Sequence, residues 1–126
     1  MKKIIQTENA PKPAGPYSQG IQVDKFLFVS GQLAIDPKEG KIVANDIKGQ
    51  TVRVMENIKA VLERNGSSLD RVVKCTAMLA DMSEWGAMNQ VYASYFPTHL
   101  PARSAFGATG LVGGARLELE CWATVQ

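Results

Sequence analysis

Arg103 and Glu120 are the two residues in this sequence whose types and positions best suit catalytic chemistry. An arginine guanidinium can hold a carboxylate through two parallel hydrogen bonds, and a glutamate can orient or deprotonate a water molecule. Together the two groups suit the addition of water to a small molecule that carries a carboxylate. An ordinary cross-strand salt bridge is the structural alternative, and the residue types alone leave both open.

The segments that carry Arg103 and Glu120 both have the composition of β-strands. They span residues 101–106 and 117–122, and a glycine-rich segment over residues 107–114 separates them. If the two strands pair as an antiparallel ribbon, Arg103 lies opposite a residue close to Glu120, which is then an adjacent or diagonal neighbour. We therefore expect the two side chains to share one small region.

The last strand predicts that this region lies at a subunit boundary. Its apolar and polar residues alternate, so one face packs on a core and the other does not. Two helices in so short a chain cover only one face, which leaves Trp122 among charged residues on the other. A large exposed aromatic side chain is typical of an interface, so we expect a homo-oligomer in which a neighbouring subunit covers it.

The remaining elements must hold these strands in place. We expect the other strands over residues 3–7, 17–23, 26–33 and 69–80. Helical spacing of apolar residues predicts one helix from Asn45 or Asp46 to Gly66, and a second from a Ser83 cap to Pro97. This order predicts a single domain over residues 1–126 with an α+β fold: a mixed six-stranded sheet with two helices packed on one face.

Three further positions could belong to a pocket. Residues 9–16 contain three prolines and a glycine, so they form a stiff loop that delivers Tyr17 to a defined place. Tyr17 then either covers a pocket or packs at the start of a strand. Gly31 interrupts a strand pattern, which marks either a β-bulge or a close approach of a ligand to the backbone. Asn89 lies near the apolar stripe of the second helix and either reaches a site or stays exposed or internally bonded.

The composition argues against several other classes of protein. The net charge is +2 with the basic residues scattered, whereas nucleic-acid binding favours a basic stripe, so we expect no nucleic-acid partner. Cys75 and Cys121 lack a zinc spacing, and His99 is the only histidine, so we expect no metal site. The N-terminus turns polar too soon for a signal peptide, and the composition predicts no membrane span, so we expect a cytoplasmic protein.

Several segments, in this order, resemble the RidA (YjgF) family of reactive-intermediate deaminases over essentially the whole chain. They are TENAP at residues 7–11, GPYSQG at 15–20, VSGQ at 29–32, NIK at 57–59, Asn89 with Tyr92 and Phe96, PARS at 101–104 and LELE at 117–120. Separate motifs in the right order are much more specific than any one of them alone.

The resemblance implies a chorismate-mutase-like α+β fold and a homotrimer with three clefts between subunits, working without a cofactor. It implies hydrolysis of 2-imino acids and their enamine tautomers, such as 2-aminoacrylate, 2-iminopropanoate and 2-iminobutanoate, to 2-oxo acids and ammonia. By resemblance, Arg103 holds the substrate carboxylate, Glu120 positions and activates the attacking water, and Tyr17 closes over the substrate. The other residues implied at the site, through backbone groups or pocket shape, are Ser30, Gly31, Asn89 and Ala105.

One position departs from the family pattern, because many members have cysteine where this chain has Ala105. Deamination survives if that position acts through its backbone, whereas a role that needs a thiol is lost. Cys121 cannot replace it, since it follows Glu120 by one position and faces the opposite side. Two other functions stay open: a non-catalytic ligand-binding or chaperone-like trimer, and an endoribonuclease or translation inhibitor, which the near-neutral charge and the solitary His99 disfavour.

Overall fold

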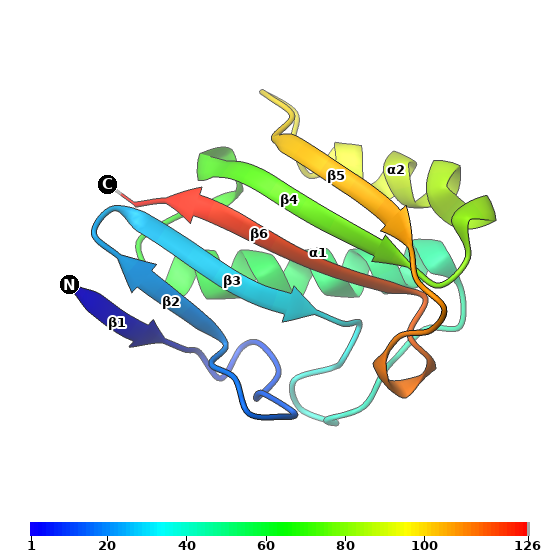
Figure 1. Ribbon diagram of the computed structural model, residues 1–126, viewed down its shortest axis with the longest axis horizontal. Coiled ribbons are helices and arrows are strands. Elements are labelled where there is room, and N and C mark those ends of the chain that lie inside the picture. The colour runs from blue at the N-terminus through cyan, green and yellow to red at the C-terminus, as the bar shows by residue number, and fades with distance from the viewer. Residues whose placement is uncertain (126) are drawn as a thin grey trace.

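Six strands form one mixed sheet in the computed structural model, which describes residues 1–125. The strands run across the sheet in the order β1, β2, β3, β6, β4, β5, and neighbours are antiparallel except for β4 and β5. Their bounds are β1 Lys2–Ile5, β2 Gly20–Val23, β3 Phe26–Gln32, β4 Val72–Leu79, β5 Ala102–Gly107 and β6 Leu117–Thr124. The predicted mixed six-stranded sheet is confirmed (Figure 1).

Both helices lie on one face of the sheet, as predicted (Figure 1). Helix α1, Ile47–Arg64, begins after Asp46, whose carboxylate accepts a hydrogen bond from the Gly49 N–H at 3.3 Å. This bond satisfies one of the N–H groups that a helix start leaves free. Helix α2, Trp85–Ser94, packs against α1. Within residues 1–125, neither helix has a long apolar stretch of the kind that crosses a bilayer.

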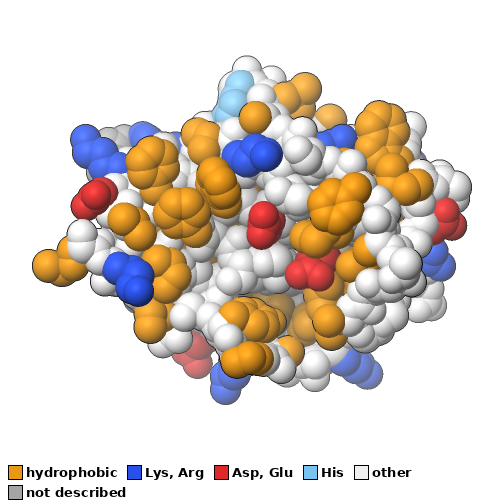
Figure 2. Space-filling view, viewed as in Figure 1, with side chains coloured by type: hydrophobic (Ala, Val, Ile, Leu, Met, Phe, Trp, Pro, Cys, Tyr) orange, Lys and Arg blue, Asp and Glu red, His pale blue; other side chains and the backbone are white. Residues whose placement is uncertain are grey.

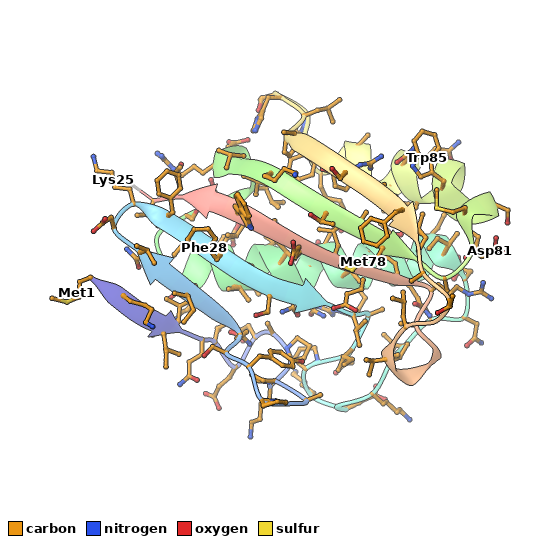
Figure 3. The ribbon with its side chains drawn as sticks, viewed as in Figure 1. Met1, Lys25, Phe28, Met78, Asp81 and Trp85 are labelled. Atoms are coloured by element: carbon orange, nitrogen blue, oxygen red, sulfur yellow. The ribbon has the colours of Figure 1, made fainter. Side chains whose placement is uncertain are left out.

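The core lies between the helices and the sheet. In β6 the residues that point toward the helices are at most 1% exposed: Leu117, Leu119, Cys121 and Ala123. The other face, here called the open face, bears Phe28, Met78, Glu120 and Trp122, and no helix covers it (Figures 1 and 3). Trp122 is 45% exposed, with its ring centroid 5.5 Å from that of Phe28. The predicted alternation, with Trp122 on the helix-free face, is confirmed.

The predicted antiparallel ribbon between β5 and β6 is wrong, because β4 lies between them. β4 pairs antiparallel with β6 and parallel with β5. A strand, helix, strand unit returns to a parallel neighbour through a crossover, so α2 carries the chain to the outer side of β4. The glycine-rich segment then passes the end of β4, where the Ala108 N–H donates to the Leu79 carbonyl oxygen and the Ala80 N–H to that of Arg116. It is a crossing connection and not a hairpin turn.

The starts of β2 and β4 and the cap before α2 also differ from the prediction. β2 begins only at Gly20, because Tyr17 still belongs to the preceding loop, where its N–H donates to the Gly15 carbonyl oxygen at 2.8 Å. β4 begins at Val72, since Leu69–Arg71 form a short 3-10 helix. Before α2 the predicted cap is displaced by two residues: Asp81 accepts a hydrogen bond from the Ser83 N–H at 2.9 Å and caps a 3-10 turn.

Asn57 ties helix α1 to the segment that follows β3. Its fully buried side chain donates to the carbonyl oxygens of Leu33 and Ile35 at 3.1 and 2.9 Å. We expect Asn57→Leu to lower the free energy of unfolding by about 2–4 kcal/mol, because two carbonyl groups lose their donor. Urea unfolding checks this value against Asn45→Ala, which removes an exposed side chain. Equal stability of the two variants would contradict the expectation.

Candidate active site

A β-bulge in β3 lies directly opposite Glu120 of β6. The pairing register shifts there, so that Ser30 and Gly31 together oppose the single residue Glu120. A bulge bends its strand and redirects the neighbouring side chains, and bulges are common beside active sites. The bulge that Gly31 predicted is therefore present, and Glu120 lies across from it on the open face.

A pocket of about 330 Å³ opens beside this bulge. Four of its lining residues are Tyr17, Ser30, Gly31 and Glu118. The other lining residues are uncharged: Ala14, Gly15, Leu33, Ile35 and Val112. Its size is at the lower end of the range for small-molecule sites. The pocket thus brings together three residues that the sequence predicted and adds Glu118, which it did not.

Buried Gln19 fixes the proline-rich loop that carries Tyr17. Its side-chain oxygen accepts a hydrogen bond from the Thr7 N–H at 2.7 Å. Its side-chain nitrogen donates to the carbonyl oxygens of Thr7 and Pro11 at 3.2 and 2.9 Å. Gln19 is 3% exposed and Tyr17 is 50% exposed, so a buried clamp holds the tyrosine ring at the rim of the pocket.

Ser30 shapes the pocket by fastening two segments together. Its hydroxyl donates to the Ser18 carbonyl oxygen at 2.6 Å, and its N–H donates to the Gln19 carbonyl oxygen at 3.0 Å. Both bonds join β3 to the residues that follow Tyr17. Because its hydroxyl proton is already engaged, Ser30 positions the pocket wall more than it offers a donor to a ligand.

Arg103 lies on the other face of the sheet, against helix α2. Its guanidinium carbon is 4.8 Å from the ring centroid of Tyr92 and 5.9 Å from that of Trp85. Aromatic rings attract a cation at these distances. Burial raises the pKa of Tyr92 far above its ordinary value, so its ring stays neutral beside the cation. No acidic side chain within residues 1–125 pairs with Arg103, which leaves its N–H groups free for a carboxylate.

Asn89 shares this side of α2, because residues 85, 89 and 92 are four and three positions apart. Trp85 extends from α2 beside β5 (Figure 3). The Asn89 Oδ1 atom is buried and accepts no hydrogen bond within the described part of the chain. A buried polar atom without a partner is uncommon and often marks a place where a ligand or water binds. Asn89 thus offers an acceptor without a partner on the same helix face as the two aromatic rings that contact Arg103.

Arg103 and Glu120 do not meet within one chain, contrary to the prediction. Arg103 pairs with buried Cys75 and so points toward the helices. Glu120 pairs with Thr76, one position further along β4, and so points to the open face. The predicted shared region and its alternative, a salt bridge between the two residues, are both wrong for a single chain. The reason is the intervening strand β4, whose register sets the two side chains on opposite faces.

The candidate site residues thus fall into two groups on opposite faces of the sheet, here called half-sites. The open-face half-site consists of Tyr17, Ser30, Gly31, Glu118 and Glu120. The α2 half-site consists of Trp85, Asn89, Tyr92, Arg103 and Ala105, the last of these on the same face of β5 as Arg103. The first half-site offers carboxylates beside a pocket, and the second offers a cation with free donors. Within residues 1–125, no three His, Cys, Asp or Glu side chains gather in a way that could hold a metal ion.

Sequence reasoning missed the roles of Glu118, Gln19 and the α2 aromatic rings. The alternation of the last strand does predict Glu118 on the same face as Glu120, two positions away, but it gives no sign that a pocket lies beside Glu118. The helical spacing of Trp85 and Tyr92 predicts only that both belong to an apolar stripe on the second helix. Their contact with Arg103 depends on how α2 docks against β5, for which the sequence holds no local signal.

Known proteins match this sequence over almost its whole length. The family model described as Endoribonuclease L-PSP matches residues 7–125. A RutC family protein of Pyrococcus horikoshii is 53% identical over 120 residues, which cover 95% of each chain. The 2-iminobutanoate/2-iminopropanoate deaminase of Mus musculus is 38% identical over 120 residues, which cover 95% of this chain and 89% of the mouse protein.

Solved structures agree with the sequence matches. The crystal structure of E. coli TdcF with bound serine has a TM-score of 0.92 at 34% identity, covering 98% of this chain and 99% of TdcF. Fold and sequence therefore agree, and the motifs that predicted the relationship all lie within the matched region. The chain belongs to the RidA (YjgF) family.

Proposed function

We propose that this protein hydrolyses 2-imino acids and their enamine tautomers, such as 2-aminoacrylate, 2-iminopropanoate and 2-iminobutanoate, to 2-oxo acids and ammonia. The observation that carries the proposal is the complementarity of the two half-sites. One has a guanidinium that lies on aromatic rings and forms no ion pair within residues 1–125, and the other has carboxylates beside a small pocket. A 2-imino acid has a carboxylate next to an electrophilic carbon, and these are the groups that the two half-sites suit. The name of the mouse relative supports the same substrates.

A homotrimer with clefts between its subunits would bring the two half-sites together. Because they lie on opposite faces of one chain, Arg103 of one subunit has to approach Glu120 of another. Large apolar side chains on the open face support such an assembly, because they are partly exposed to solvent in a single chain. Phe26 is 48% exposed and Trp122 is 45% exposed. Figure 2 shows this face, where apolar side chains surround acidic ones. An exposed apolar patch of this kind is typical of a surface that a partner covers.

In the proposed reaction, Arg103 holds the substrate carboxylate and so places the imine carbon beside Glu120. Glu120 accepts a proton as the water oxygen bonds to this carbon, and the electron pair of the C=N double bond moves to nitrogen. Glu120 returns the proton to the nitrogen and then transfers the proton of the hydroxyl group to the same nitrogen. The C=O bond forms as the C–N bond breaks, and ammonia leaves with both protons. Acid–base assistance of this kind contributes about 10²- to 10⁴-fold, which suits an intermediate that already hydrolyses unaided.

The remaining predicted residues complete the proposed cleft. Tyr17 closes over the substrate from the rim of the pocket, and Ser30 and Asn89 shape its walls. Backbone groups at Gly31 and Ala105 contact the imine. Because position 105 acts through its backbone in this scheme, alanine in place of the more common cysteine leaves deamination intact. The reaction as written needs no cofactor, and the cytoplasm stays the predicted location.

A coupled assay tests the proposed function. A pyridoxal-phosphate dehydratase generates 2-aminoacrylate or its four-carbon homologue, and the 2-oxo acid is followed with and without this protein. We expect the protein to accelerate 2-oxo acid formation at least about tenfold, since its acid–base group assists water addition. An unchanged rate, together with binding of 2-oxo acids, would instead favour a non-catalytic ligand-binding trimer. The same preparation incubated with single-stranded RNA tests the activity that the family description names.

A further inference from the structure

Asn65 and Gly66, which follow the last residue of helix α1, favour a reaction between neighbouring residues. The backbone nitrogen that follows an asparagine can attack the side-chain amide and close a five-membered ring. A side chain on the attacking residue hinders this step, and glycine has none. Asn65 is the only one of the five asparagines that a glycine follows. The reaction is therefore least hindered at the end of α1.

Hydrogen bonds hold Asn65 at this helix end. Its side-chain nitrogen donates to the Val61 carbonyl oxygen at 2.7 Å, and its backbone N–H donates to the Leu62 carbonyl oxygen at 3.1 Å. These bonds satisfy carbonyl groups that the end of a helix leaves free. The Ser67 N–H also donates to the Leu62 carbonyl oxygen, and the Ser67 hydroxyl donates to the Thr124 carbonyl oxygen at 2.7 Å. Ser67 thus fastens the segment after α1 to the end of β6.

The folded backbone keeps the reacting atoms of Asn65 and Gly66 apart. Ring closure needs the Gly66 nitrogen and the Asn65 side chain on the same side of the bond between Cα and the carbonyl carbon. The ψ angle of 26° at Asn65 turns the nitrogen away from the side chain. Gly66 is exposed, and its N–H has no hydrogen-bond partner within residues 1–125. The attack therefore requires that the last turn of α1 opens and that the backbone rotates at Asn65.

We propose that Asn65 and Gly66 form a deamidation site that reacts when the last turn of α1 opens. The Gly66 nitrogen bonds to Cγ of Asn65 and loses its proton, the Cγ–Nδ2 bond breaks, and the side-chain nitrogen leaves as ammonia. Water then opens the ring. Cleavage between the ring nitrogen and Cγ leaves aspartate, whereas cleavage between this nitrogen and the backbone carbonyl carbon leaves isoaspartate. The reaction consumes one water molecule and needs no other co-reactant.

Deamidation should weaken the end of α1. A carboxylate at position 65 has no hydrogen to donate to the Val61 carbonyl oxygen, and it places a negative charge where the helix dipole is also negative. We expect Asn65→Asp, which carries the aspartate product, to lower the Tm by about 3–6 °C in thermal unfolding. Asn45→Asp adds the same charge at an exposed position before the N-terminus of α1 and should not lower the Tm. Equal losses in the two variants would contradict this effect.

Peptide mapping by mass spectrometry measures the reaction itself. The full-length protein is incubated in neutral buffer, and trypsin then releases residues 65–71, in which Asn65 is the single asparagine. Replacement of the amide by a carboxylate raises the mass of this peptide by about 1 Da, and chromatography separates the aspartate and isoaspartate forms. We expect Asn65 to react at least about tenfold faster than the other four asparagines. The same protein unfolded in urea should react about tenfold faster again at Asn65, because no helix end then holds the side chain.

Two serine variants test whether opening of the helix end controls the rate. Ser67→Ala removes the hydroxyl that bonds to the end of β6 and should raise the rate at Asn65 about threefold, since local opening becomes easier. Ser68→Ala removes a neighbouring hydroxyl that forms no capping hydrogen bond and should leave the rate unchanged. The proposal fails if Asn65 reacts no faster than the other asparagines, if folded and unfolded protein react equally, or if the two serine variants do. None of these rates depends on turnover, so they are independent of the proposed deaminase.

Discussion

Arg103→Ala is expected to lower kcat/KM for 2-aminoacrylate by about a hundredfold or more in the coupled assay. Two charge-assisted hydrogen bonds to the substrate carboxylate are lost, and each contributes about 1.5–3 kcal/mol. The loss should appear mainly as weaker binding of the substrate and of 2-oxo acids. Measurement of kcat/KM with the dehydratase in excess, together with titration of 2-oxobutanoate, checks both expectations.

The fold of this variant should survive, which makes the loss of activity interpretable. Arg103 forms no ion pair within residues 1–125, so its removal forfeits chiefly the contacts with Tyr92 and Trp85. Such cation–π contacts contribute about 1–2 kcal/mol, which thermal unfolding can resolve. Arg64→Ala, at an exposed position near the end of α1, is the matched control and should retain full turnover. Unchanged ammonia release by Arg103→Ala would refute the assigned role.

The elements of this fold could be predicted because each has a local signal. The strict alternation in β6 predicted which of its faces is buried. The apolar spacing in α1 predicted a helix, and Asp46 indicated where that helix begins. The pairing of the strands could not be predicted in the same way. Nothing local to residues 107–114 distinguishes a hairpin turn from a connection that crosses the end of β4. Strand order depends on the crossover through α2, which is a property of the whole chain.

The candidate site shows the same division between local and long-range information. The bulge at Gly31 was predictable from a glycine inside a strand pattern, and the rim position of Tyr17 followed from the stiffness of its loop. The separation of Arg103 from Glu120 could not be predicted from local sequence. A strand inserted between two others changes the register, and the register decides which face each side chain occupies. The positions of Arg103 and Glu120 on opposite faces have a consequence for catalysis. Two groups on opposite faces can act on one substrate only if a second subunit supplies one of them, whereas two groups on one face need no second subunit.

Two inactive variants are therefore expected to regain activity when they assemble into one trimer. Arg103→Ala supplies an intact open-face half-site, and Glu120→Gln supplies an intact α2 half-site. In a trimer that contains both chains, one of the three clefts combines the two intact half-sites, so about a third of the wild-type kcat per trimer should return. Co-expression with two different affinity tags, followed by purification on both, isolates the mixed trimers for the coupled assay.

The mixed trimers distinguish a site shared between subunits from a site within one chain. If Arg103 and Glu120 acted from the same chain, every cleft would lack one of them and the mixture would stay inactive. Trimers that carry either variant under both tags control for effects of the tags and should show no activity. A chain with both substitutions, combined with either single variant, should likewise remain inactive, because at least one half-site is then missing from every cleft. Recovery confined to the mixture of the two single variants therefore means that the guanidinium and the carboxylate approach each other across a subunit boundary. Such an approach is expected because the two side chains point to opposite faces within one chain.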